Sequence, residues 1–280
     1  MPGGHATRAG RLRVVPLVTL STDIGWEYAA QMKAVLARGL PFGHIVDLSH
    51  EIRPHAVREA AFLLRHMAAD YPAGTIHVAI VDPGVGGSRA PVALECRNGS
   101  FLVGPDNGVL WPLARTLGFV RAVRLRREQV GVTGPLSPTF QGRDLFAPAA
   151  VALANGRPLS SLGPAQEPSR VELPRPRRTP RAMIGELVHI DRFGNLITNL
   201  PAAWDPPGRS PAELVLSRRA PRRLARARSY SDLEVGELGL LVSSFGLLEV
   251  AQREGSAAER LGAETGERVE LRPAASPARA

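Results

Sequence analysis

An apolar run from Thr75 to Val81, which ends at an acid, a proline and three glycines, restricts the fold of this chain more than any other stretch. A continuous apolar run of this length is typical of a strand buried on both faces of a parallel sheet. The glycines after Asp82 leave a loop of backbone with few side chains. Ligands of open α/β sheets bind outside the carboxyl ends of the strands, so the sequence places Asp82 beside a candidate pocket.

Strand and helix patterns alternate through the first half of the chain. Apolar runs predict strands over residues 14–22, 45–48 and 75–81, and the helical spacing of apolar residues predicts helices over 28–38 and 55–70. A hairpin around an Asn-Gly pair is predicted for 92–96 and 101–103, and further helices for 107–117 and 143–154. This alternation favours an α/β N-terminal domain with a mostly parallel sheet over residues 14–163.

The pattern changes after residue 163. Residues 164–182 hold five prolines among arginines, a composition that excludes a helix or a central strand and predicts a linker. Short strand-like segments follow over 184–190, 195–199, 213–216, 222–230, 238–242 and 247–251, without a convincing helix. They predict a smaller C-terminal β-barrel domain over residues 183–272, and residues 1–13 and 273–280 are expected to be flexible tails.

The net charge and the cysteine content exclude or disfavour several classes of function. The net charge is +9, carried almost wholly by arginine, with clusters over 121–127, 170–181 and 218–228. Such clusters attract nucleic acid, but no aromatic residues accompany them for base stacking, so a solvent-facing or partner-facing surface is favoured and nucleic-acid binding is disfavoured.

Cys96 is the only cysteine, which excludes a disulfide within the chain and a zinc site of several cysteines, and it is expected to be a small buried side chain.

Several signatures of other protein classes are missing from the sequence. It contains neither Gly-x-x-x-x-Gly-Lys nor His-Glu-x-x-His, and its seven histidines lack metal-ligand spacing, so no metal or cofactor is expected. No apolar run approaches the roughly 20 residues that cross a bilayer. Residues 1–13 lack the apolar core of a signal peptide, and a cytoplasmic protein is expected.

Asp23 ends the first predicted strand, at a favoured ligand position of an α/β sheet. A carboxylate there can accept hydrogen bonds from two hydroxyl groups, as a ribose diol offers. Asp is equally suited to cap the N-terminus of the helix that follows, so the residues alone leave these two roles open.

Other polar segments also allow two interpretations each. Asp82 and Arg89 are opposite charges on one glycine loop, which either folds back so that they pair or forms a surface turn. Residues 138–144 open a helix, where backbone N–H groups could hold a polar group, or form a capping turn with a weak surface ion pair. Residues 191–195 could hold a ligand, but the local sequence is best explained by a hairpin turn. The same two interpretations apply to residues 243–246.

Taken together, these segments resemble the S-adenosylmethionine hydrolase family, the SAM hydroxide adenosyltransferases, which are related to the fluorinase and chlorinase. The matching segments are 20–25, 45–52, 60–64, 74–86, 103–108, 138–148, 190–199, 230–232 and 244–251, in this order over roughly residues 17–262. The resemblance implies an N-terminal α/β domain and a C-terminal β-barrel. It also implies a homotrimer that holds the nucleoside between the N-terminal domain of one subunit and the barrel of its neighbour.

The resemblance further implies roles for single substrate-binding residues. Asp23 would hold the ribose hydroxyls. Asp191 and Ser244 would hold the amino acid end of the methionine. Phe193 would pack on the adenine, and Asn195 would bond the adenine edge.

The hydrolases of this family activate water with an Asp, an Arg and a His. Asp82 and Arg89 match the first two, whereas Gln141 stands in the histidine position of Pro-Thr-Phe-His-Gly-Arg-Asp. A glutamine amide cannot take up a proton near neutral pH, but its carbonyl oxygen can orient a water. Arg253 and Ser256 are further departures, since they stand where the hydrolases carry asparagines near the adenine edge.

The activity implied by the resemblance is hydrolysis of S-adenosyl-L-methionine to adenosine and L-methionine, by attack of water on the ribose C5′. Because Gln141 replaces the family histidine, a non-catalytic or weakly active protein that binds S-adenosylmethionine or adenosine is the alternative. Halide transfer to C5′ is disfavoured, since the halogenases of the family replace the loop that carries Asp82.

Overall fold

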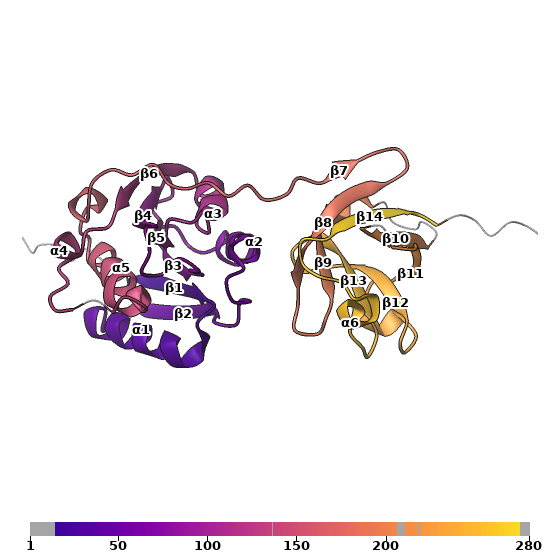
Figure 1. Cartoon of the computed structure of the whole chain (residues 1–280), viewed down its shortest axis with the longest axis horizontal. Coiled ribbons are helices and arrows are strands. Elements are labelled where there is room, and N and C mark those ends of the chain that lie inside the picture. The colour runs from indigo at the N-terminus through magenta and orange to yellow at the C-terminus, as the bar shows by residue number, and fades with distance from the viewer. Residues whose placement is uncertain (1–14, 136, 206–210, 218, 275–280) are drawn as a thin grey trace, which may run out of the picture. The chain divides into compact units, whose positions relative to one another are not determined.

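The computed structural model describes residues 15–135, 137–205, 211–217 and 219–274 (Figure 1). The expected tail 1–13 and residues 275–280 of the other expected tail lie outside these ranges. By their contacts, the described residues form two compact units, one ending at Val171 and one starting at Glu172, except that residues 58–66 group with the second unit. Each unit has its own sheet and its own hydrophobic core.

The described residues of the first unit form a six-stranded sheet. Its strands are β1 (Leu17–Thr22), β2 (His44–Ser49), β3 (Ile76–Ile80), β4 (Pro91–Cys96), β5 (Phe101–Pro105) and β6 (Phe119–Arg124). They lie in the order β2-β1-β3-β5-β4-β6. The pairs β1–β2, β1–β3 and β3–β5 are parallel, whereas β4 runs antiparallel to β5 and β6. The predicted mostly parallel sheet and the predicted hairpin are therefore confirmed.

Helices connect these strands along the chain. They are α1 (Gly25–Gly39), α2 (Val57–Ala68), α3 (Trp111–Thr116), α4 (Arg127–Val130), a π-helical turn η1 (Gly142–Phe146), α5 (Ala147–Ala154) and a 3-10 turn η2 (Leu159–Ser161). Helices α1 and α5 lie side by side on one face of the sheet (Figure 1). Met32 and Leu36, which recur at helical spacing on α1, share one buried core with Val18 and Leu20 of β1. This core holds the carboxyl end of β1 beside the start of α1.

Strand β6 is a difference from the sequence analysis, which expects only an arginine cluster there. Ala122 and Val123 are buried, whereas Arg121 and Arg124 are exposed. Strand β6 pairs only with β4 among the described strands and forms the edge of the sheet. The outer side of β6 is covered by residues 162–166, since the N–H of Arg124 donates to the carbonyl oxygen of Pro164 (2.9 Å) and the N–H of Gln166 donates to that of Ala122 (3.0 Å). A covered edge strand cannot pair with another chain.

Helix α3 also begins later than expected, at Trp111 rather than at residue 107. The side chain of Asn107 is the reason, because its Oδ1 accepts a hydrogen bond from the N–H of Val109 (3.2 Å). Such a local turn competes with helical hydrogen bonding.

Seven strands of the described part of the second unit close into a β-barrel. They are β8 (Met183–Ile190), β9 (Leu196–Pro201), β10 (Ala212–Leu216), β11 (Arg222–Arg226), β12 (Leu238–Val242), β13 (Leu247–Gln252) and β14 (Arg268–Pro273). They pair in the order β14-β10-β11-β12-β13-β9-β8, and the pairing of β14 with β8 closes the ring. The short strand β7 (Arg177–Arg178) pairs with β8 from within the segment predicted to be a linker. The predicted β-barrel is confirmed.

The barrel also carries short helical turns, η3 (Ala202–Trp204) and η4 (Tyr230–Asp232), and a short helix α6 (Ala257–Leu261) that the sequence analysis does not predict. Helix α6 begins with a cap in which Ser256 Oγ accepts a hydrogen bond from the N–H of Glu259 (3.1 Å). It ends at Gly262, whose φ is 56°. A helix this short shows no apolar periodicity, but the Ser-x-x-Glu spacing is a start signal that could have revealed it.

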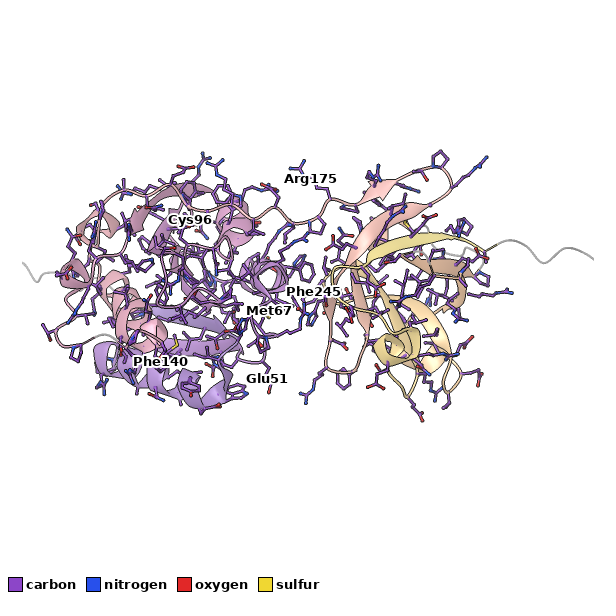
Figure 2. All side chains as sticks on the ribbon, viewed as in Figure 1. Glu51, Met67, Cys96, Phe140, Arg175 and Phe245 are labelled. Carbon is purple, nitrogen blue, oxygen red and sulfur yellow. The ribbon has the colours of Figure 1, made fainter. Side chains whose placement is uncertain are left out.

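Cys96 is buried and free, as expected from the sequence (Figure 2). Burial raises the pKa of its thiol to about 12, so it stays protonated at neutral pH. No helix in the part of the chain that the structure describes is both long enough and apolar enough to span a membrane.

We expect the stability of the fold to depend on pH through His77. Its ring lies in β3 opposite Thr19 of β1, with 2.8 Å between Nδ1 and Thr19 Oγ1, and burial lowers its pKa from 6.5 to about 4. Between these two values the unfolded chain binds a proton that the folded chain excludes, so stability falls as the pH drops from 6.5 to 4. At about 1.4 kcal/mol per pKa unit, the loss is about 3 kcal/mol.

Urea unfolding at pH 7 and pH 4.5 measures this loss. In His77→Asn, whose amide keeps a hydrogen-bonding group near Thr19 but does not titrate, the loss should be about 2 kcal/mol smaller. Equal losses in the variant and in the unchanged protein would show that His77 does not govern the acid sensitivity.

Candidate functional site

The carboxyl ends of β1, β3 and β5 meet at one edge of the first sheet, because these strands are parallel neighbours. Asp23 follows β1 directly, and its N–H donates to the carbonyl oxygen of Ile80 at the end of β3 (3.3 Å). Asn107, which follows β5, donates from Nδ2 to the carbonyl oxygen of Val81 (2.8 Å). The structure therefore places Asp23 and Asp82 at the same edge, where ligands of α/β sheets bind.

The side chain of Asp23 does not cap helix α1. The N-cap residue is Ile24, and no side chain makes a capping hydrogen bond there. Instead, Asp23 Oδ2 accepts a hydrogen bond from the N–H of His55 (2.9 Å). Oδ1 has no hydrogen-bond partner among the described residues, so it can accept a hydroxyl group of a ligand.

Asp82 and Arg89 form a two-pronged ion pair on the glycine loop. Arg89 Nε donates to Asp82 Oδ1 (2.9 Å), and Nη2 donates to Oδ2. The side chains are only 5% and 11% exposed, and the guanidinium lies 5.6 Å from the centre of the Phe146 ring. Gly86 has a φ of 77°, and a Cβ there would lie 2.7 Å from the carbonyl oxygen of Pro138. The glycine therefore lets this loop pack directly on the segment that leads to Gln141.

Gln141 precedes the π-helical turn η1 and makes no capping hydrogen bond. Its Oε1 is buried and has no hydrogen-bond partner among the described residues. The following Gly142 packs tightly, since a Cβ there would lie 3.0 Å from Met32 Sδ and 3.1 Å from Ile80 Cδ1 at the end of β3. A buried acceptor without a donor is costly in free energy, so this oxygen is suited to receive a water or a ligand hydroxyl.

Asp144, in the same turn, has a structural role. Its Oδ2 accepts a hydrogen bond from the N–H of Ser137 (2.8 Å), and both of its oxygens accept from Arg143 (2.6 and 3.0 Å). The hydrogen bond from Arg143 holds the pKa of Asp144 below its usual value. The Arg143–Asp144 pair considered in the sequence is therefore present, whereas no side chain caps the turn η1.

The first unit thus presents a carboxylate with a free oxygen, a buried ion pair and a buried amide oxygen. These groups can accept hydrogen bonds from hydroxyl groups and can hold a water molecule. Within the described residues, no three His, Cys, Asp or Glu side chains are arranged to hold a metal ion.

Asp191 organises the turn between β8 and β9. Its Oδ1 accepts hydrogen bonds from the N–H groups of Phe193 and Asn195, and its Oδ2 accepts one from Asn195 Nδ2, all at 2.9 Å. Gly194 adopts a φ of 81°, which completes the turn. The hairpin turn favoured by the local sequence is present, and it leaves Phe193 70% exposed in this unit.

Ser244 lies in the turn that joins β12 to β13. The N–H of Ser243 donates to the carbonyl oxygen of Leu247 (2.8 Å), and the N–H of Gly246 donates to that of Ser243 (3.0 Å). Ser244 itself is exposed, so its hydroxyl faces solvent in this unit.

Glu249 is a residue of interest that the sequence analysis does not single out. It is 3% exposed, and its Oε1 accepts a hydrogen bond from the hydroxyl of Tyr230 (2.7 Å). Burial raises the pKa of Glu249, and the nearby charge of Asp191 raises it further. Burial and this carboxylate also raise the pKa of Tyr230 to about 12. An acid inside the apolar run 247–251 was the signal available in the sequence.

Arg253 and Ser256, the two departures from the family pattern, have structural partners in the barrel. Arg253 Nη1 donates to the carbonyl oxygen of Leu233 (2.7 Å), and Ser256 caps helix α6. The first contact ties the segment after β13 to the segment before β12, and the second starts α6, so neither residue depends on a ligand for its place.

An α/β unit with acids at its sheet edge, followed by a closed β-barrel, defines a two-domain protein that offers polar groups to a small molecule. The model of the SAM hydroxide adenosyltransferase N-terminal domain matches residues 18–163, and the model of the C-terminal domain matches residues 185–270. The chain belongs to the SAM hydroxide adenosyltransferase family, which confirms the resemblance found in the sequence.

Named relatives and solved structures agree with this assignment. The chain is 39% identical to an (R)-S-adenosyl-L-methionine hydrolase of Salinispora tropica, over 91% of this chain and 97% of the relative. It is 40% identical to a protein of the same name from Thermus thermophilus, over 91% and 99%. A fluorinase of an Actinoplanes species is 27% identical over 66% of this chain and 72% of the fluorinase. The crystal structure of an uncharacterized conserved protein from Thermotoga maritima matches with a TM-score of 0.83 and 31% identity, over 91% of this chain and 99% of that chain.

Proposed function

We propose that this protein hydrolyses S-adenosyl-L-methionine to adenosine and L-methionine, with water attacking the ribose C5′. The observation that carries the proposal is the buried Asp82–Arg89 pair at the carboxyl edge of the sheet. This pair lies in a chain that is 39% identical, over nearly its full length, to an (R)-S-adenosyl-L-methionine hydrolase. The fluorinase of an Actinoplanes species is more distant, at 27% identity over about two thirds of the chain, which favours water over halide as the nucleophile.

The chemistry needs little more than orientation of the water. The sulfonium of the substrate makes methionine a neutral leaving group, so the C5′–S bond breaks as the C5′–O bond forms. Holding the water in line with that bond removes much of the barrier. A carboxylate paired with an arginine is a weak base. Asp82 therefore orients the water by accepting one hydrogen bond, and the free Oε1 of Gln141 accepts a second. The proton released from the attacking water passes to solvent.

Substrate binding would draw on both units. Asp23 would hold the ribose hydroxyls through its free oxygen, and Phe193 would pack on the adenine, whose edge Asn195 would bond. Asp191 and Ser244 would hold the amino acid end of the methionine. The exposed ring of Phe193 supports this role, since an aromatic side chain this exposed is suited to cover a ligand.

We further propose that the enzyme is a homotrimer whose sites lie at subunit interfaces, and that it acts in the cytoplasm. The family resemblance supports the assembly, because the nucleoside of such proteins lies between the N-terminal domain of one subunit and the barrel of the next.

Turnover with product identification tests the proposed function. Purified protein incubated with S-adenosyl-L-methionine in heavy-oxygen water should release equal amounts of adenosine and methionine, with the label in the 5′-hydroxyl of adenosine. Tight calorimetric binding of the substrate without any adenosine would instead identify a binding protein on this fold. A halogenated nucleoside formed only when chloride or fluoride is added would identify halide transfer.

A further inference from the structure

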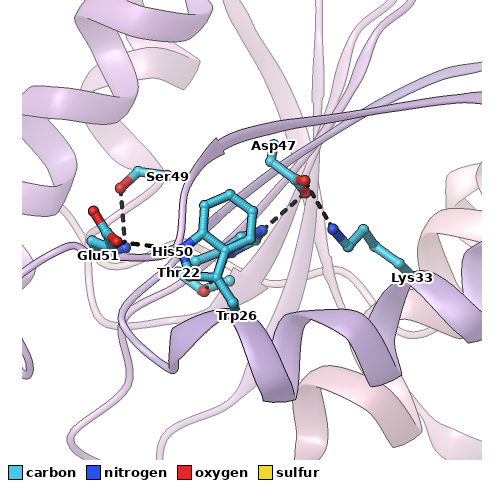
Figure 3. Close-up of polar contacts among 7 residues, drawn as sticks. All are labelled: Thr22, Trp26, Lys33, Asp47, Ser49, His50 and Glu51. Carbon is cyan, nitrogen blue, oxygen red and sulfur yellow. Dashed lines mark hydrogen bonds and ion pairs between the residues drawn. The ribbon is translucent and has the colours of Figure 1, made fainter.

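A series of hydrogen bonds runs from Thr22, the residue before Asp23, through His50 to Asp47, and is not part of the proposed chemistry. His50, which is 1% exposed, contacts Thr22 Oγ1 through Nδ1 and Asp47 Oδ1 through Nε2, both at 2.9 Å (Figure 3). Because a carboxylate only accepts hydrogen bonds, Nε2 carries the proton toward Asp47, and Nδ1 of the neutral ring accepts from the hydroxyl of Thr22. Lys33 Nζ donates to the other oxygen of Asp47 (2.8 Å).

At the Asp47 end of this series of hydrogen bonds, the neighbouring groups favour the ionised form of the Asp47 carboxylate. Burial opposes ionisation of Asp47, but the hydrogen bonds from Lys33 and His50 outweigh it and hold the pKa of Asp47 below its usual value. Trp26 closes the network, with its ring edge-to-face with the His50 ring at 4.8 Å and its Nε1 donating to Glu51 Oε1 (3.3 Å). Thr22 and His50 are the buried members of this network, and a polar network whose members are all paired is rigid.

The order carboxylate, imidazole, hydroxyl is also that of a nucleophilic triad. Here the hydroxyl belongs to Thr22, which is fully buried, and the imidazole of His50 is equally enclosed. Neither group reaches a ligand, so the network does not supply a nucleophile.

The network instead fastens the segment 49–55 to the end of β1. The N–H of Gly25 donates to the carbonyl oxygen of His50 (3.2 Å), and the N–H of Ile52 donates to that of Thr22 (3.4 Å). At the far end of the segment, the N–H of His55 donates to Asp23 Oδ2 (2.9 Å). His55 adopts a φ of 67°, in the left-handed region, which costs any residue other than glycine some free energy even though histidine enters it more often than most. The surrounding contacts must therefore hold it in place.

We propose that Asp47, His50 and Thr22 are positioning residues that set the direction of the Asp23 carboxylate toward a vicinal diol. Thr22 adjoins Asp23 in the chain, and His50 anchors the segment whose tip orients Asp23 Oδ2. The inference rests on the proposed function, in which Asp23 holds the ribose hydroxyls. Loss of the Thr22–His50 bond would let the segment shift and would cost the enzyme its preference for a diol.

Calorimetric binding of adenosine and of 2′,3′-dideoxyadenosine tests the proposal. Thr22→Val removes the hydroxyl at nearly constant volume, and Thr22→Ser is the matched control that keeps it. The unchanged protein and Thr22→Ser should prefer adenosine, and in Thr22→Val this preference should shrink about 10-fold, as expected for one lost hydrogen-bonded contact. Binding of the dideoxy compound should stay the same in all three, which a general loss of folding would not allow.

Two further variants keep the outcomes distinct. His50→Gln keeps an amide donor that reaches Asp47 from the Nε2 position but leaves the Nδ1 position, beside Thr22, without an acceptor. It should therefore behave like Thr22→Val, and it takes the place of that variant if Thr22→Val folds poorly. Asp23→Asn should lose the preference for adenosine. If Asp23→Asn loses it while Thr22→Val and His50→Gln keep it in full, the positioning role is wrong and the proposed function stands. If the unchanged protein shows no preference, both the ribose role of Asp23 and the positioning role are wrong.

Discussion

Asp82→Asn is expected to lower turnover of S-adenosyl-L-methionine by about 10²-fold, because the water is then held less well in line with the C5′–S bond and a misplacement of about 1 Å can cost this much. The substitution keeps the size of the side chain but removes its charge beside Arg89. Because the pair is buried, leaving the arginine unpaired also costs about 3–5 kcal/mol of folding free energy. A fall in activity alone would therefore not separate chemistry from stability.

The double variant Asp82→Asn with Arg89→Gln separates these two effects. It removes both charges, so urea unfolding should show most of the lost stability restored, since no buried charge is left unpaired. Turnover in the double variant should stay about as low as in the single variant. If turnover returned together with stability, the ion pair would be purely structural and the water would be held by other groups.

Gln141→His is expected to raise turnover by about 10²-fold, since an imidazole adds a general base where the amide only orients the water. The buried Oε1 of Gln141 has no partner among the described residues, so the site receives the new ring without breaking a hydrogen bond of the fold. The variant should also gain a pH dependence. A general base acts when it is unprotonated, so the rate should rise with pH through the ordinary histidine range near 6.5.

Gln141→Asn is the matched control for this prediction. It keeps the amide but shortens its reach by one carbon, so turnover should fall while the pH profile keeps its shape. A histidine variant that is no faster than the unchanged protein, with an unchanged pH profile, would show that proton transfer does not limit the reaction.

Much of the fold follows from local patterns. The strand and helix alternation up to residue 163 and the short strands after residue 183 predict an α/β domain and a barrel, and both are present. Strand β6 is absent from the prediction because an edge strand with exposed arginines lacks an apolar pattern. Helix α6 is absent from the prediction because five residues are too few to show a helical periodicity.

The sequence indicates some residues of the candidate site but not others. Asp23 and Asp82 stand out in the sequence because each ends an apolar strand. His50 did not, since a single histidine beside a short strand carries no signal of its own. Its role depends on partners three and twenty-eight positions away in the chain. Glu249 was hidden in the same way, as one acid within an apolar run whose partner Tyr230 lies beyond the preceding strand.

The sequence by itself determined the fold class and put acids at the ends of buried strands, because periodicity and strand termination are properties of contiguous residues. Only the tertiary structure decided that Asp82 and Arg89 are buried together, that the oxygen of Gln141 lacks a partner and that His50 joins Thr22 to Asp47. These features depend on which strands are neighbours in the sheet and on what covers them. How far apart two residues lie in the sequence determines neither the neighbours of a strand nor what covers it.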